Sequence, residues 1–128
     1  MKKCDYCAKE VSLNEYYCSE DCEKHAIDYY TVVKDKEKIF SVINVISFFS
    51  ICASLIWTMF QPYVGLYILS GVLLVVSILF YIYPFATGLM LEKYKVKKSV
   101  SIIKKIAIAI LVLSIIITIV TTFVFYVK

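Results

Sequence analysis

The sequence predicts an all-α membrane protein in which three transmembrane helices follow a small cysteine-rich module. Hydrophobic residues make up 61% of the 128 residues, well above the roughly 45–50% that is usual in soluble domains. All ten acids and thirteen of the fourteen lysines lie before residue 39 or between residues 92 and 105. We therefore expect a polar module with its connecting helix at residues 1–38 and a membrane domain at residues 39–128.

The module contains two short-spaced cysteine pairs, CDYC at Cys4 and Cys7 and CSEDC at Cys18 and Cys22. This spacing brings four thiolates within reach of one tetrahedral zinc ion. The alternatives are a disulfide, unrelated buried thiols, or a redox CxxC, which would need a strand-to-helix context. A structural Zn²⁺ is favoured, because about 38 residues are too few to bury a self-sufficient core. His25 is an alternative fourth ligand, but four cysteines already complete the set.

Residues 1–18 predict a β-hairpin whose first turn holds the first cysteine pair, since Val11 and Leu13 alternate with polar neighbours. Ser19 is a good helix N-cap, and acids favour the positive end of a helix dipole in the first turn that follows. No helix breaker stands between residues 20 and 40. The helix is therefore expected to continue toward the membrane. Four residues mark one apolar side of it: Ala26, Tyr29, Tyr30 and Val33. We expect this side to pack on the module or on lipid, and the alternative is a groove for a partner.

Three apolar runs follow, at about residues 39–60, 63–85 and 106–127. Each has roughly 22 residues, which as a helix reach about 33 Å and can cross a hydrocarbon core of about 30 Å. Gln61 and Pro62 form the whole first loop, so the first two spans predict an antiparallel hairpin. Pro84 predicts a kink or an end of the second span.

The lysines predict the orientation of these spans. The charged second loop contains six lysines and one acid between residues 92 and 105, and Lys34, Lys36 and Lys38 precede the first span. The positive-inside rule places both segments in the cytosol. We therefore expect a multi-pass protein of the plasma membrane with a cytosolic N-terminus and its C-terminus outside. Free or metal-bound thiols, which persist in a reducing cytosol, agree independently with this orientation.

No Asp, Glu, Lys, Arg or His lies inside the three runs, which argues against an ion pump or a coupled transporter. The first and third runs carry hydroxyl side chains along one side, which we expect to serve helix packing rather than a solute path. The module has seven lysines and nine acids, a net charge of −2. Nucleic-acid binding by the module is therefore disfavoured, whereas the lysine loop suits anionic lipid head groups.

The stretch CDYCAKEVSLNEYYCSEDCEKH resembles small zinc-ribbon or treble-clef modules, in which a CxxC knuckle precedes a CSxxC pair that opens a helix. It is most similar to prokaryotic zinc-ribbon proteins whose module precedes transmembrane helices, and a small cytosolic DNA gyrase inhibitor family has a similar pattern. The resemblance covers about the first 25 residues. It implies Ser19 as the cap and four metal ligands: Cys4, Cys7, Cys18 and Cys22.

Two positions depart from that pattern. Such knuckles usually read CPxCG, whereas this chain has Asp5 and Ala8 at the proline and glycine positions. Alanine tolerates a left-handed backbone less well than glycine, so we expect strain at Ala8. No catalytic role is established for the membrane relatives, so the resemblance implies metal binding and tethering.

The leading hypothesis is a non-enzymatic membrane protein that presents a structural zinc module at the cytosolic membrane surface for protein-protein interaction or assembly. Its expected partners are the lipid bilayer and a protein, and three spans with few contacts are compatible with a homo-oligomer. One alternative is a membrane-tethered nucleic-acid or gyrase binder. Another is a small channel or an accessory subunit of a transporter.

Overall fold

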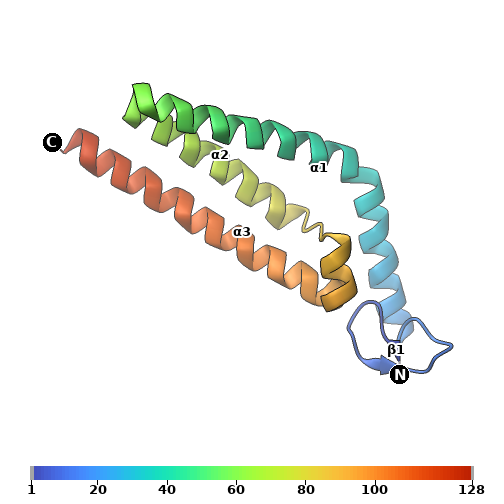
Figure 1. The fold of residues 1–128 in the computed structure, drawn as a ribbon. Coiled ribbons are helices and arrows are strands. Elements are labelled where there is room, and N and C mark those ends of the chain that lie inside the picture. Colours follow the sequence, from blue (N-terminus) through green and yellow to red (C-terminus); the bar gives the residue numbers. More distant parts are fainter. Residues whose placement is uncertain (1, 128) are drawn as a thin grey trace.

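The computed structural model describes residues 2–127 and consists of two short strands followed by three long helices. Strands β1 (Lys2–Lys3) and β2 (Glu10–Val11) form the N-terminal hairpin. They are followed by α1 (Glu20–Phe60), α2 (Pro62–Ile82) and α3 (Gly88–Tyr126). All three helices are long and apolar enough to cross a membrane. Figure 1 shows them as an elongated bundle with the hairpin at one end.

The expected hairpin is present, but its strands are short. β1 and β2 pair antiparallel, with Lys2 opposite Val11 and Lys3 opposite Glu10, and the CDYC segment forms the turn between them. Val11 is buried, whereas Leu13 is 78% exposed. The predicted alternation therefore ends after Val11, and the chain up to Ser19 is irregular.

Helix α1 runs without interruption from the module into the first span, as the absence of breakers predicts. Ser19 caps it, because its hydroxyl accepts a hydrogen bond from the Cys22 N–H at 3.3 Å. The helix bends where its polar first part meets its apolar second part (Figure 1). On the predicted apolar side, Ala26 is completely buried, and the Tyr29 hydroxyl accepts a hydrogen bond from the Ala86 N–H at 2.9 Å. Tyr30 is instead 44% exposed, so only part of this side packs inside the protein.

Helix α2 follows α1 after Gln61 alone, and Pro62 takes its first position. Proline suits this position because the first N–H groups of a helix have no partner within the helix. α2 ends at Ile82, three residues before the expected boundary of the second span. Pro84 explains this end, because it lacks an N–H donor and disfavours helical geometry at the preceding residue.

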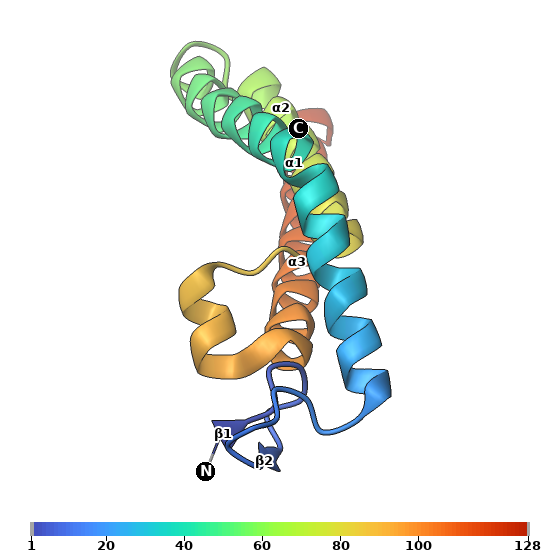
Figure 2. The ribbon, with the colours of Figure 1, turned by 90° about the vertical axis from the view of Figure 1, so that its right-hand side faces the viewer.

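Helix α3 corrects the expectation of a charged loop between the second and third spans. The segment of residues 92–105 is helical, as the first part of α3. Lysine and glutamate are good helix formers, so the clustered charge indicates position relative to the membrane and does not exclude a helix. α3 is sharply kinked at Lys95, where φ is 61° and ψ is 172°. Figure 2 shows the short segment before the kink turning into the long one.

Helix α2 packs against both α1 and α3, and small and hydroxylated residues make these contacts close. The Ser77 hydroxyl donates to the Ala107 carbonyl at 2.7 Å, and the Ser114 hydroxyl donates to the Ser70 carbonyl at 2.8 Å. Ser47 and Ser54 of the first span and Thr121 of the third are also buried. The hydroxyl groups thus serve helix packing, as expected for helices in lipid.

The two ends of the bundle differ in composition. The hairpin, the first part of α1 and the lysine-rich first part of α3 lie at one end, whereas the turn between α1 and α2 and the end of α3 lie at the other (Figure 1). The charged segments are therefore on the same side of the three apolar stretches. This arrangement is that of a multi-pass membrane protein.

Gly65 provides a test of the packing between α1 and α2. A Cβ atom at this position would lie 2.6 Å from the backbone nitrogen of Thr58 and 2.7 Å from its Cα. We expect Gly65→Ala to destabilise the protein by about 1–3 kcal/mol, because the backbone of α1 must shift. Thermal unfolding in detergent, followed by circular dichroism, measures the effect.

The matched control is Gly71→Ala in the same helix, where an added Cβ meets nothing within 4 Å. Alanine is the better helix former, so this variant should be neutral or stabilised by up to about 1 kcal/mol. Equal stability of the two variants would contradict the close contact between the helices.

Candidate metal centre

Four cysteines of the module lie close together: Cys4, Cys7, Cys18 and Cys22. Their four sulfur atoms all lie within 4.8 Å of one another. The Sγ of Cys18 is 3.3 Å from that of Cys7 and 3.3 Å from that of Cys22, and all four thiols are free. These residues could hold a metal ion. Sites closed by four thiolates are structural in proteins, because they leave no open position for a substrate.

The first pair is held by the backbone of the turn between β1 and β2. The Cys4 N–H donates to the Lys9 carbonyl at 2.7 Å, and the Ala8 N–H donates to the Cys4 carbonyl at 3.0 Å. The turn closes through a positive φ of 66° at Ala8. Ala8 therefore has the strained backbone expected where alanine replaces the usual glycine. The turn that it closes places Cys7 beside Cys18 of the second pair.

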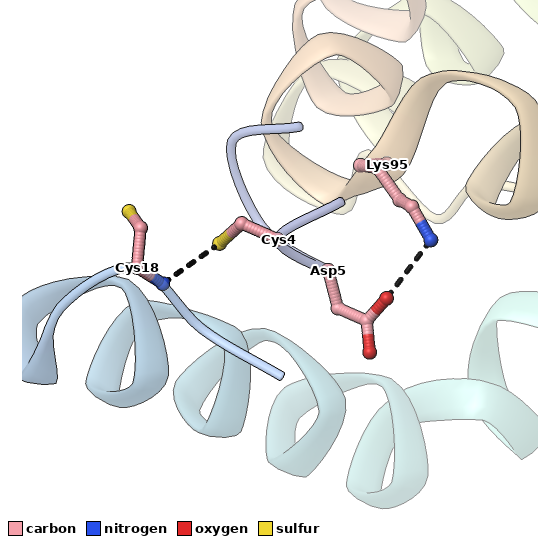
Figure 3. A network of polar contacts seen from close by, with 4 residues as sticks. All are labelled: Cys4, Asp5, Cys18 and Lys95. Atoms are coloured by element: carbon pink, nitrogen blue, oxygen red, sulfur yellow. Dashed lines mark hydrogen bonds and ion pairs between the residues drawn. The ribbon is translucent and has the colours of Figure 1, made fainter. Parts of the chain in front are cut away.

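The second pair is positioned by the start of α1. Cys18 precedes the cap residue Ser19, and Cys22 is the third residue of the helix. The Cys18 N–H donates to the Sγ of Cys4 at 3.4 Å, which links the two pairs (Figure 3). Backbone donors of this kind orient thiolate ligands and stabilise their charge.

Hydrogen bonds shift the pKa values of two of the thiols in opposite directions. Burial of Cys4 opposes its ionisation, but backbone N–H groups of Cys7, Tyr6 and Cys18 donate to it and lower its pKa from 9.0 to about 6. Hydrogen bonds with Cys22 and Cys7 instead raise the pKa of Cys18 from 9.0 to about 12. A metal ion held by these thiols would displace their remaining protons, so its binding would weaken as the pH falls.

His25 does not belong to the cysteine cluster. Its Nδ1 lies 2.6 Å from the Asp21 carbonyl oxygen, one turn earlier in α1, and its ring packs against Tyr6 with centroids 5.5 Å apart. The prediction of a histidine on the helix surface is in accord with this position. The side chain is exposed.

The turn that carries the first cysteine pair also contacts the kink of α3. The Lys97 N–H donates to the Tyr6 carbonyl at 3.0 Å, and the Val96 N–H to the Asp5 carbonyl at 3.4 Å. The Lys95 ammonium pairs with the Asp5 carboxylate at 2.9 Å (Figure 3). The N–H groups of Val96 and Lys97 begin the helix after the kink, where N–H groups lack partners within the helix. The sequence does not predict this contact, and its one local signal is Asp5 at the position of the usual proline.

No known protein family matches this chain, and comparisons with curated proteins and with solved structures also find no match. The likeness to zinc-ribbon modules accordingly rests on the cysteine pattern and on the clustering of the four sulfurs. Binding of a metal by these four cysteines stays a prediction.

Ala8 offers a test of how the turn supports metal binding. A left-handed backbone costs a residue other than glycine about 1–2 kcal/mol. We expect Ala8→Gly to relieve part of this strain and to tighten metal binding about fivefold, equivalent to about 1 kcal/mol. Competition with a chelator, using the purified full-length protein, measures the affinity.

The control is Ala8→Val, because a β-branched side chain tolerates positive φ least. This variant should bind metal more weakly than the wild type. If glycine and valine changed the affinity in the same direction, the strain would not govern the site.

Proposed function

We propose that this protein is a non-enzymatic membrane protein that holds a structural zinc module at the cytosolic membrane surface for protein-protein interaction or assembly. The observation that carries the proposal is the cluster of four cysteine sulfurs on a polar head joined directly to the first span by α1. A set of four thiolates suits a structural role. The continuous helix gives the head a fixed place at the membrane.

Zinc suits the donor set. Soft thiolates in a tetrahedral S₄ arrangement select zinc or iron–sulfur chemistry, and zinc is the usual ion of small folded modules. Around one ion with bonds of about 2.3 Å, neighbouring sulfurs lie about 3.8 Å apart. The observed separations extend from 3.3 Å to at most 4.8 Å, so small side-chain rotations would enclose the ion.

The outer face of the head supports a protein partner. Leu13 and Tyr16 are 78% and 60% exposed there. Leu13 lines a hollow of about 460 Å³ together with Glu10, Glu15 and other residues of the module. An exposed apolar side chain among acids fits an apolar contact with a basic rim. The same acidic charge disfavours DNA, so the tethered nucleic-acid or gyrase binder has less support.

A channel or transporter subunit also has less support. The hydroxyl groups of Ser77 and Ser114 donate to carbonyl groups of a neighbouring helix. Those of Ser54, Thr58 and Thr118 donate within their own helices. Hydroxyls engaged in this way do not line a polar path, and the three apolar runs contain no ionisable Asp, Glu, Lys, Arg or His.

The proposed orientation is tested by labelling with a membrane-impermeant maleimide in a Cys52→Ser background. Asn14 and Gln61 are exposed at opposite ends of the bundle. We expect Gln61→Cys to react in intact cells and Asn14→Cys only after permeabilisation, because the lysines favour a cytosolic head. The background without an added cysteine gives the baseline. Reaction of Asn14→Cys in intact cells would reverse the orientation.

The proposed contact surface is tested by Leu13→Asp in the full-length protein. Burying a leucine contributes about 1.5–3 kcal/mol, so this charge should lower recovery of a co-purified partner by about tenfold or more. Leu13→Met is the control and should retain the partner. Leu13 is not part of the cysteine cluster, but Cys18 lines the same hollow, so metal content is measured in both variants, and loss of the partner counts only where the metal is retained.

Cys18→Ser extends the test to the metal centre. If zinc gives the head its shape, this variant should lose both the metal and the partner. Equal recovery of every partner with wild type, Leu13→Asp and Cys18→Ser would remove the module as the contact surface.

A further inference from the structure

A feature that the proposed function leaves unexplained lies where the module, α1 and α3 meet. A hollow of about 540 Å³ opens there, within the range of about 300–1,000 Å³ typical of ligand sites. Tyr6 of the turn and His25 of α1 line one side, and Lys97, Lys104 and Lys105 of α3 line the other. The residues that enclose it include three lysines and no carboxylate, which indicates an anionic ligand.

The three lysines all line the same hollow. Lys97 and Lys104 stand seven residues apart, two turns of the same helix, so they lie on one face. The Lys104 ammonium lies 5.5 Å from the centre of the Tyr81 ring, a cation–π distance that limits where the side chain points. All three lysines are exposed and are therefore available to a ligand.

A second hollow lies beside the first, in the apolar part of the bundle. It measures about 350 Å³ and lies between α2 and α3, bordered by Ser77, Ile78 and Leu111 among others. Tyr81 and Ile108 line both hollows, so the two are adjacent. The second contains no lysine or acid and lies beside the apolar run that starts at residue 106. A basic hollow and an apolar groove are thus neighbours where the lysine segment meets the third apolar run.

We infer that this composite site binds one anionic phospholipid, with its phosphate at the three lysines and an acyl chain in the groove between α2 and α3. The combination matches a lipid better than a soluble phosphate, because a soluble anion has nothing to place in the apolar groove. Basic pockets between transmembrane helices at the membrane surface are a recognised way of holding anionic lipid head groups. The site is separate from the cysteine cluster, although Tyr6 of the turn forms part of its wall.

Native mass spectrometry of the purified full-length protein in a nonionic detergent tests the inference. The probes are phosphatidylglycerol, phosphatidylcholine with the same acyl chains, and glycerol 3-phosphate. Wild type should bind phosphatidylglycerol at least about tenfold more tightly than the other two. Equal binding of phosphatidylcholine would overturn the role of the lysines, and equal binding of glycerol 3-phosphate would assign the site to a soluble phosphate.

Two double variants with the same change of charge separate the site from general surface attraction. Lys104→Gln with Lys105→Gln should weaken phosphatidylglycerol binding about 30-fold, from roughly 1 kcal/mol for each lysine. Lys93→Gln with Lys98→Gln should weaken it by no more than about threefold. Lys93 and Lys98 are also exposed on α3, but they lie beside Tyr94 and do not line the hollow. Equal losses in the two variants would reduce the effect to diffuse surface charge.

Ile78→Trp tests the groove, because Ile78 is exposed and lines the second hollow but not the first. A larger side chain there should weaken phosphatidylglycerol binding and leave the weak binding of glycerol 3-phosphate unchanged. Unchanged lipid binding would overturn the placement of the acyl chain. Metal content and melting temperature are measured for every variant. Because the substituted side chains are exposed, we expect each variant to remain folded, so that a loss of lipid binding reports on the site.

Discussion

The contact between the cysteine turn and the kink of α3 holds the polar end of the protein together. Asp5 and Tyr6 offer backbone carbonyls to the N–H groups of Val96 and Lys97, and the Asp5 carboxylate pairs with Lys95. A head of this size buries too little apolar surface to fold alone. Its shape therefore depends on its own cysteine cluster and on a helix that lies about ninety residues further along the chain. In return, the turn supplies acceptors for amides that the kink leaves without helical partners.

This contact joins the two sites that we propose. Tyr6 lies between Cys4 and Cys7 in the chain, accepts the hydrogen bond from Lys97, and forms part of the wall of the lysine-lined hollow. A change in the cysteine turn would therefore reach the proposed lipid site without any contact between the two sites. The hollow beside Leu13 shares no lining residue with the lysine-lined hollow and belongs to a different surface of the head. The head thus has one face that we propose for a partner and another that faces the helices.

The membrane part follows a separate logic. Lipid is as apolar as the helices, so hydrophobic burial does not drive them together, and close approach and hydrogen bonds must serve instead. Gly65 lets α2 approach the backbone of α1, and Ser77 and Ser114 bond α2 to α3. α2 is consequently the central helix of the bundle. Large apolar side chains point outward, with Phe48 and Phe49 63% and 65% exposed, as suits contact with lipid.

The sequence by itself determined the three apolar spans, the break at Pro84, the cap at Ser19 and the strain at Ala8, because each depends on length, composition or local backbone chemistry. It also indicated which cysteines meet, since their spacing is short. Only the tertiary structure decided that the lysine segment is helical, that Lys95 adopts a positive φ without being glycine, and that its neighbours meet Asp5 and Tyr6. The helix itself agrees with the local preference of lysine and glutamate, whereas the positive φ at Lys95 accompanies contacts between segments about ninety residues apart. The hollow between them exists only because both segments are in place.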